Sequence, residues 1–146
     1  MLFRSFRATR DGWDTTTMYN NTPGGNVYFV CKTVEGYILG GYLSISPKRS
    51  GYASDSNAFI FRLDSPIKGN PQVYNGWSLY QYSYYSASAS HLNYFGFGGG
   101  HDLLFEDMST VRVVNKSGSG ASYQSIGPVN SSSTLYYNIV EFEVWS

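Results

Sequence analysis

Short runs in which apolar and polar residues alternate are the feature of this sequence that most restricts its fold. Residues 26–33 and 37–46 both alternate with a period of two, and Val34, Glu35 and Gly36 join them. A period of two places successive side chains on opposite faces of a strand, so the two runs predict a β-hairpin. Further strands are expected at 58–63, 72–74, 79–84, 101–106, 110–114 and 136–145, separated by stretches rich in Gly, Pro and Ser.

Helical patterns are confined to the N-terminal end. Leu2, Phe3 and Phe6 recur at helical spacing and predict a short helical turn within residues 2–8. Asp14 can cap a second short helix, because its carboxylate can accept hydrogen bonds from the free backbone N–H groups of the first turn. The expected fold is therefore mainly β: a two-sheet antiparallel β-sandwich flanked by short helices at the N-terminal end, with residues 1–146 as a single domain.

Charge and hydropathy exclude two classes of protein. Ten Lys and Arg residues balance ten Asp and Glu residues, so the chain lacks the basic excess of a dedicated nucleic-acid binder. No stretch approaches 18 apolar residues, and the N-terminus has two arginines in its first seven residues and no apolar run of seven or more. We therefore expect no nucleic-acid partner, no integral membrane segment and no signal peptide.

Two strands allow a prediction of which face is buried. In the first strand Val27, Phe29 and Cys31 share one face, and we expect this face to lie in the core. Cys31 is the only cysteine, so it forms no disulfide within the chain, and its burial would make the thiol unreactive. An unpaired thiol favours a cytoplasmic location. In the strand at 58–63 we expect Phe59 and Phe61 to face the core, with Ile60 and Arg62 opposite.

The sequence contains no set of residues that can be assembled into a catalytic site. His101 and Asp102 are adjacent, so on a strand they point to opposite faces and do not form a dyad. The glycines at 98–100 precede a strand and lack a following Lys-Ser/Thr pair, which excludes a phosphate-binding loop. The two histidines, His91 and His101, have no metal-ligand spacing. We expect no catalytic residue, no metal and no cofactor, and hence not an enzyme.

The C-terminal strand carries a pair of carboxylates. Strict alternation places Glu141 and Glu143 on one face with Ile139, and places Asn138, Val140, Phe142 and Val144 on the other. The carboxylates are expected to be solvated or to pair with a basic group from Lys48 and Arg49, Arg62 or Arg112. Exposed Tyr and Trp beside Asn and Asp leave a second possibility, a sugar-stacking face on a carbohydrate- or surface-binding module.

The order of these segments resembles that of a TLDc domain, and the resemblance covers essentially the whole chain. The stretches that carry it are Leu2–Arg4, Thr9–Trp13, Val27–Lys32, Gly36–Tyr42, Asp55–Leu63, Phe97–Leu103 and Val140–Trp145.

The resemblance implies a β-sandwich without established catalytic residues that acts by binding a protein. Members of this family are associated with resistance to oxidative stress and with binding the cytosolic sector of the vacuolar proton pump (V-ATPase). By position, it implies partner-binding roles for Gly99, Gly100, Asp102 and Glu141, and structural roles for Gly40 and Gly41. It further implies a cytoplasmic location, with any membrane association made through the partner. The carbohydrate- or surface-binding module remains the alternative.

Overall fold

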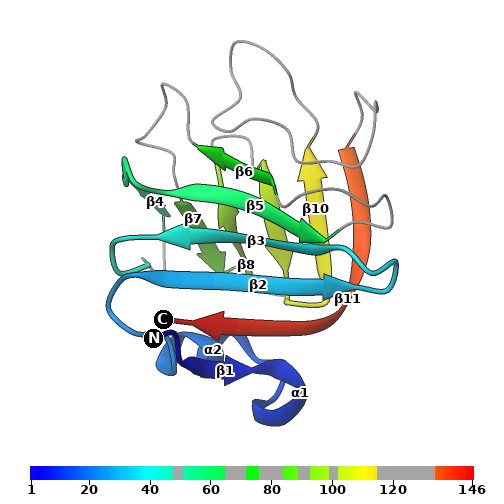
Figure 1. Ribbon diagram of the computed structural model, residues 1–146. Helices are drawn as coiled ribbons and strands as arrows, with labels where there is room; N and C mark the ends of the chain where they lie inside the picture. Colours follow the sequence, from blue (N-terminus) through cyan, green and yellow to red (C-terminus); the bar gives the residue numbers. More distant parts are fainter. Residues whose placement is uncertain (48–50, 65–71, 76–83, 89–92, 99–101, 115–133) are drawn as a thin grey trace.

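The strands of this protein outnumber its helices by far, as Figure 1 shows. A computed structural model of the chain describes residues 1–47, 51–64, 72–75, 84–88, 93–98, 102–114 and 134–146. The helices in these residues are α1 (Ala8–Asp11) and α2 (Thr15–Asn20). The strands are β1 (Arg4–Arg7), β2 (Val27–Thr33), β3 (Ile38–Leu43), β4 (Gly51–Ala53), β5 (Phe59–Asp64), β6 (Gln72–Asn75), β7 (Tyr84–Ser88), β8 (Asn93–Phe97), β9 (Leu103–Glu106), β10 (Thr110–Val114) and β11 (Thr134–Trp145).

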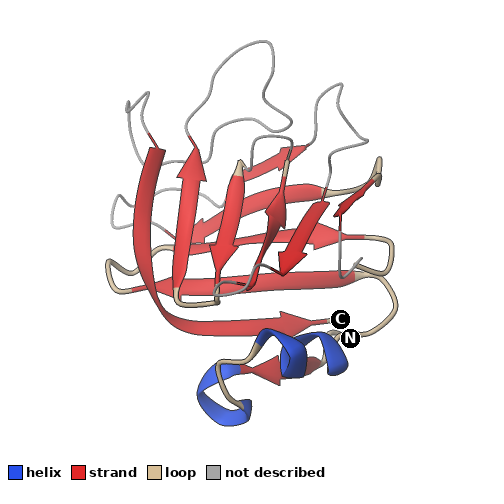
Figure 2. Ribbon diagram, turned by 180° about the vertical axis from the view of Figure 1, so that it is seen from behind, coloured by secondary structure: helices blue, strands red, loops and turns tan. Residues whose placement is uncertain are grey.

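One hydrogen-bonded path connects the described strands. Its order is β4-β7-β8-β9-β10-β11-β2-β3-β5-β6, and β1 pairs with β11 outside this path. All pairs are antiparallel. In Figures 1 and 2, β2, β3 and β5 run across one layer, β7 to β10 form a second layer behind it, and β11 curves from one layer into the other.

This arrangement confirms the predicted antiparallel, mainly β fold with short helices near the N-terminus. Two separate sheets packed as a sandwich are not confirmed, because the strands form a single open sheet. The connection is β11, which pairs with β10 through Thr134–Asn138 and with β2 through Ile139–Trp145. Alternation along a sequence predicts that a segment is extended, but it does not show that one strand is shared by two layers.

Aromatic side chains fill the space between the layers. Phe29 of β2 lies 5.5 Å from Phe95 of β8, and Phe105 of β9 lies 5.0 Å from Phe142 of β11, measured between ring centroids. Most of these pairs are tilted or edge-on, which is the arrangement that the ring quadrupoles favour. The core therefore joins both halves of the sheet through rings from strands far apart in sequence.

A bulge in β11 makes part of the predicted alternation wrong. The register with β2 shifts between Ile139 and Glu141, which inserts one extra residue. Ile139 is consequently buried, whereas Val140 is 44% exposed. Phe142 and Val144 share a face, as predicted, and both are buried in the core. A bulge has no signal in a pattern of alternating apolar residues, so strict alternation could not locate it.

The N-terminal segment also differs from the prediction. Residues 4–7 form β1 rather than a helical turn, and the helix α1 begins only at Ala8. The reason is non-local: β11 offers an edge with which β1 pairs, and Phe6 is buried in the core. The second helix is confirmed, since the Asp14 carboxylate accepts hydrogen bonds from the backbone N–H groups of Thr16 and Thr17.

The hairpin of β2 and β3 and the buried face of β2 are as predicted, but the orientation of β5 is wrong. Val27, Phe29 and Cys31 are fully buried in the core. Phe59 and Phe61 do share a face of β5, yet this is the outer face, and Ile60 occupies the core. Of the strand expected at 79–84, only Tyr84 lies within the described residues.

The bulge leads to a prediction for two neighbouring positions of β11. We expect Phe142→Ala to lower the free energy of unfolding by about 3–5 kcal/mol, because it removes a fully buried ring from the core. We expect Val140→Ala to lower it by less than about 1 kcal/mol, since this side chain is largely exposed. Urea unfolding measures both values. Equal losses for the two variants would contradict the bulged register.

Candidate interaction site

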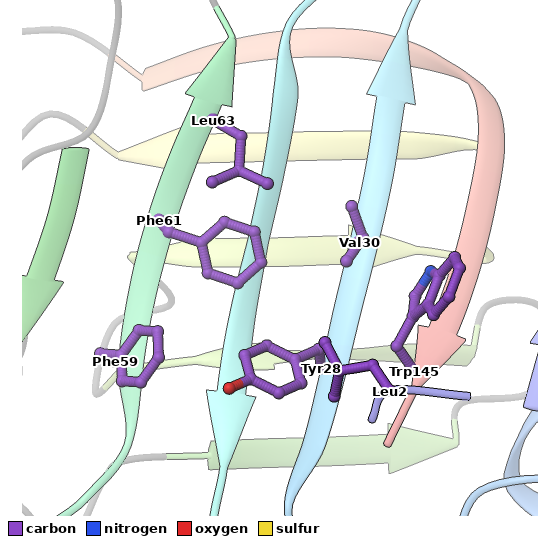
Figure 3. Close-up of a pocket in the computed structure, with 7 residues that line it drawn as sticks. All are labelled: Leu2, Tyr28, Val30, Phe59, Phe61, Leu63 and Trp145. Carbon is purple, nitrogen blue, oxygen red and sulfur yellow. The ribbon is translucent and has the colours of Figure 1, made fainter. Parts of the chain in front are cut away.

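The outer face of β2, β3 and β5 carries an apolar groove of about 410 Å³, which Figure 3 shows. One wall comes from β5, the other from β2, and the C-terminal end of β11 and the N-terminal segment contribute at one end. The groove is lined by Leu2, Tyr28, Val30, Phe59, Phe61, Leu63 and Trp145. This set lies on the side of the layer that faces away from the core.

The floor of the groove depends on a glycine in β3. Gly40 pairs with Val30 on one side and with Phe61 on the other. A Cβ at Gly40 would collide with the Phe61 ring and with the carbonyl oxygen of Phe29. The ring therefore packs down over the glycine, an arrangement that stabilises glycines within strands, and Phe61 is only 4% exposed despite facing outward.

The neighbouring Gly41 has the corresponding role on the core side. A Cβ there would collide with the Phe97 ring. Successive residues of a strand face opposite sides, so two adjacent glycines admit one aromatic ring on each face of β3. A structural role for Gly40 and Gly41 stays a prediction, and these close contacts with aromatic rings support it.

A row of aromatic rings crosses one end of this outer face. Tyr42 of β3 lies 4.8 Å from Tyr28 and 4.9 Å from Phe59, measured between ring centroids. These residues are direct cross-strand neighbours, the pairs that contribute most to the stability of a sheet. The hydroxyl of Tyr42 donates a hydrogen bond to Oδ1 of Asn26 at 2.8 Å. The row therefore holds the wall residues Tyr28 and Phe59 in place.

Ion pairs tie the N-terminal segment to β11 beside the groove. Nη1 of Arg4 lies 2.9 Å from Oε1 of Glu143, and Nε of Arg7 lies 2.9 Å from Oε2 of Glu141. The indole N–H of Trp145 donates to Oε2 of Glu143, and the Arg4 guanidinium lies 5.6 Å from the centroid of the same indole. Arg4 and Arg7 were not among the basic residues that the sequence suggested for these carboxylates.

Glu141 is the most extensively bonded of these carboxylates. It accepts hydrogen bonds from Nε of Arg7 and from the backbone N–H and hydroxyl of Thr9, and its side chain is 17% exposed. Burial raises the pKa of the Glu141 carboxyl, but the hydrogen bonds from Thr9 and Arg7 outweigh this effect, so the pKa lies below its ordinary value.

Of the proposed partner-binding residues, the two that the structure describes, Glu141 and Asp102, do not line the groove. Glu141 lines a smaller adjoining cavity of about 170 Å³ with Val30 and Lys32. Asp102 lies directly before β9 in the other layer, is 5% exposed, and packs against Gly98. Gly99 and Gly100, like His101, lie outside the described residues. A partner-binding role for these four residues stays a prediction.

The sequence did contain a signal for the groove. Ala58, Phe59, Ile60 and Phe61 form a continuous apolar run, and Tyr28 and Val30 are apolar on the face opposite the core. A strand with apolar side chains on both faces is typical of one that is covered on both sides. The prediction gave each strand a single buried face, and for this reason it did not include the groove.

The chemistry of the groove is that of apolar contact. Its wall exposes no polar atom of the described residues. Sugar hydroxyl groups placed there would lose water without gaining hydrogen bonds, so this site does not favour the carbohydrate alternative. The described residues also include no group of three or more His, Cys, Asp and Glu side chains arranged to hold a metal ion. No helix among them is long and apolar enough to cross a membrane.

Comparison with known proteins identifies the family. The family model of the TLDc domain matches residues 1–146, which is the whole of the sequence. The chain therefore belongs to the TLDc domain family. A search of curated proteins found no match.

The bonding of Glu141 predicts a pH-dependent contribution to stability. A carboxyl group whose pKa is lowered by folding stabilises the protein above its unfolded pKa, about 4.3, and this contribution is lost as the pH falls through the folded pKa. We expect Glu141→Gln to lower the free energy of unfolding by about 1–3 kcal/mol at pH 7 and by less at pH 3. Glu35→Gln, at an exposed turn, is the control. Denaturant unfolding at both pH values measures this, and an equal loss at both would contradict it.

The environment of Cys31 predicts slow thiol chemistry. Burial raises the pKa of the Cys31 thiol to about 12, although a backbone hydrogen bond with Leu39 opposes this. Almost no thiolate exists at pH 7.5, and a reagent reaches the sulfur only when the core opens. We expect a thiol reagent to label the native protein at least about a hundredfold more slowly than the urea-unfolded protein. Equal rates, followed by absorbance, would show that the thiol is accessible.

Proposed function

We propose that this chain is a non-enzymatic protein-interaction domain that binds and regulates the cytosolic sector of the vacuolar proton pump and contributes to resistance against oxidative stress. The match to the TLDc domain over the whole sequence carries this proposal. The site of action is the cytoplasm, and any association with a membrane is made through the pump.

The described surface supports binding rather than turnover. The outer face of β2, β3 and β5 exposes an apolar groove, and exposed apolar surface of this kind marks interaction sites. The buried thiol bears on the stress-related role as well. Since Cys31 is fully buried, protection against oxidants comes through a partner and not through reaction of this residue with peroxide.

Direct capture of the pump tests this function. The chain is immobilised, and binding of the purified cytosolic sector is followed by interferometry. We expect wild-type capture, and we expect Glu141→Gln to slow association about twofold to fivefold, because it removes a charge at a position assigned to the rim of the interface. Glu35→Gln removes the same charge from an exposed turn and should capture the sector as the wild type does.

Two results would contradict parts of the proposal separately. If the folded wild-type chain fails to capture the sector, the assigned partner is wrong. If both variants capture it equally, the binding surface lies away from Glu141. A thermal melt of each variant shows that it is folded, since the expected destabilisation is smaller than the stability of a typical domain.

A further inference from the structure

The position of the groove within the sheet restricts the backbone of whatever binds there. Its floor is β3, which pairs with β2 on one side and with β5 on the other. An extended peptide laid over this floor would find no sheet edge to pair with, and its own N–H and C=O groups would lose water without replacement. A helix forms its backbone hydrogen bonds internally, so it can cover this surface at no such cost.

The dimensions of the groove also fit a helix. The walls on β2 and β5 are separated by two strand spacings, or roughly 9–10 Å, which is close to the diameter of a helix with its side chains. Figure 3 shows Phe59, Phe61 and Leu63 following one another along one wall. The four residue steps from Phe59 to Leu63 span roughly 13 Å of extended strand. A helix covers that length in about nine residues, with apolar side chains at positions i, i+3 or i+4, and i+7.

A positive charge at one end of the groove favours a ligand that carries an acidic group. Lys32 follows Val30 on the outer face of β2, is exposed, and makes no ion pair with the described residues. The adjoining cavity shares Val30 with the groove, and its lining includes Lys32 together with the carboxylates of Glu141 and Glu143. The Arg4 and Arg7 cations are already paired with Glu143 and Glu141. Among the described residues that line these two cavities, Lys32 is therefore the cation that an acidic group of a ligand can pair with.

The small size of the groove argues against a second copy of the chain as its occupant. The lining consists of seven residues. A stable interface between folded proteins uses about 20–30 residues on each side. A groove of this extent suits one inserted element better than a docked globular surface.

We propose that the groove binds an amphipathic helix of the partner protein, whose apolar face contacts Phe61, Leu63 and Val30 and whose acidic end faces Lys32. This inference rests on the proposed function, because it names the part of the partner that this domain recognises. It does not depend on which protein supplies the helix.

A designed peptide tests the proposal on the full chain. The probe is a stapled helix of about 15 residues with leucines at i, i+4 and i+7 and glutamates at both ends. Its control has the same composition with the leucines on different faces of the helix. We expect the probe to shift the backbone NMR signals of residues around Val30, Phe61 and Leu63, and the control peptide to leave them unchanged at about 1 mM.

Matched variants distinguish specific binding in the groove from nonspecific binding of an apolar peptide elsewhere on the surface. Leu63→Asp should weaken binding of the probe about tenfold or more, because it places a charge in the apolar wall. Val140→Asp changes a side chain of the same exposure outside the groove, 44% against 46%, and should leave binding unchanged. A probe with lysines in place of the glutamates should bind wild type about twofold to fivefold more weakly, and Lys32→Glu should reverse this preference.

The proposal is overturned if the control peptide shifts the same signals, if no signal moves, or if Leu63→Asp and Val140→Asp behave alike. It is also overturned if the wild-type chain alone forms a dimer that Leu63→Asp abolishes in sedimentation, since the occupant is then a second copy. Probe binding without capture of the pump sector would contradict only the assigned partner. Capture unaffected by Leu63→Asp would place the binding surface elsewhere while leaving the proposed function intact.

Discussion

The shared pairing of β11 is the constraint on which the rest of this structure depends. Its N-terminal part pairs with β10, and its C-terminal part pairs with β2 and β1. The bulge after Ile139 lets the strand bend between the two layers and returns Phe142 and Val144 to the core. Among the described strands, β11 is the one whose hydrogen bonds join the layer of β2 to the layer of β10, and it thereby holds the aromatic rings of the two layers together.

The same strand also determines where the candidate site lies. Beyond the bulge, Glu141 and Glu143 face outward and hold Arg7 and Arg4, so the N-terminal segment is fixed along the edge of β11. This places Leu2 and Trp145 at the end of the groove. The adjacent glycines of β3 complete it, because one admits a core ring and the other lets Phe61 pack low on the outer face.

Much of the local structure could be predicted from the sequence. The hairpin and the capped helix after Asp14 depend on contacts between residues close in the chain, and both predictions are confirmed. The buried face of β2 is also confirmed, because the alternation along this strand leaves Lys32 on the opposite face. Two predictions were wrong: the helical turn at residues 2–8, and the strict alternation of faces along β11. Each of these structures depends on pairing with a segment that is distant in the chain. The groove was missed for a related reason: Phe59 was assigned to the core when the true core residue is Ile60.

The sequence by itself determined that the chain is mainly β and that it belongs to the TLDc domain family, since alternation and motif order are local properties. Only the tertiary structure decided which face of β5 is buried. Both of its faces carry large apolar side chains, so the choice between Ile60 and Phe61 is made by what packs against each side. The second layer covers Ile60, whereas the outer rings pack around Gly40 and leave a groove. That outcome depends on contacts between strands far apart in the chain, which no local pattern contains.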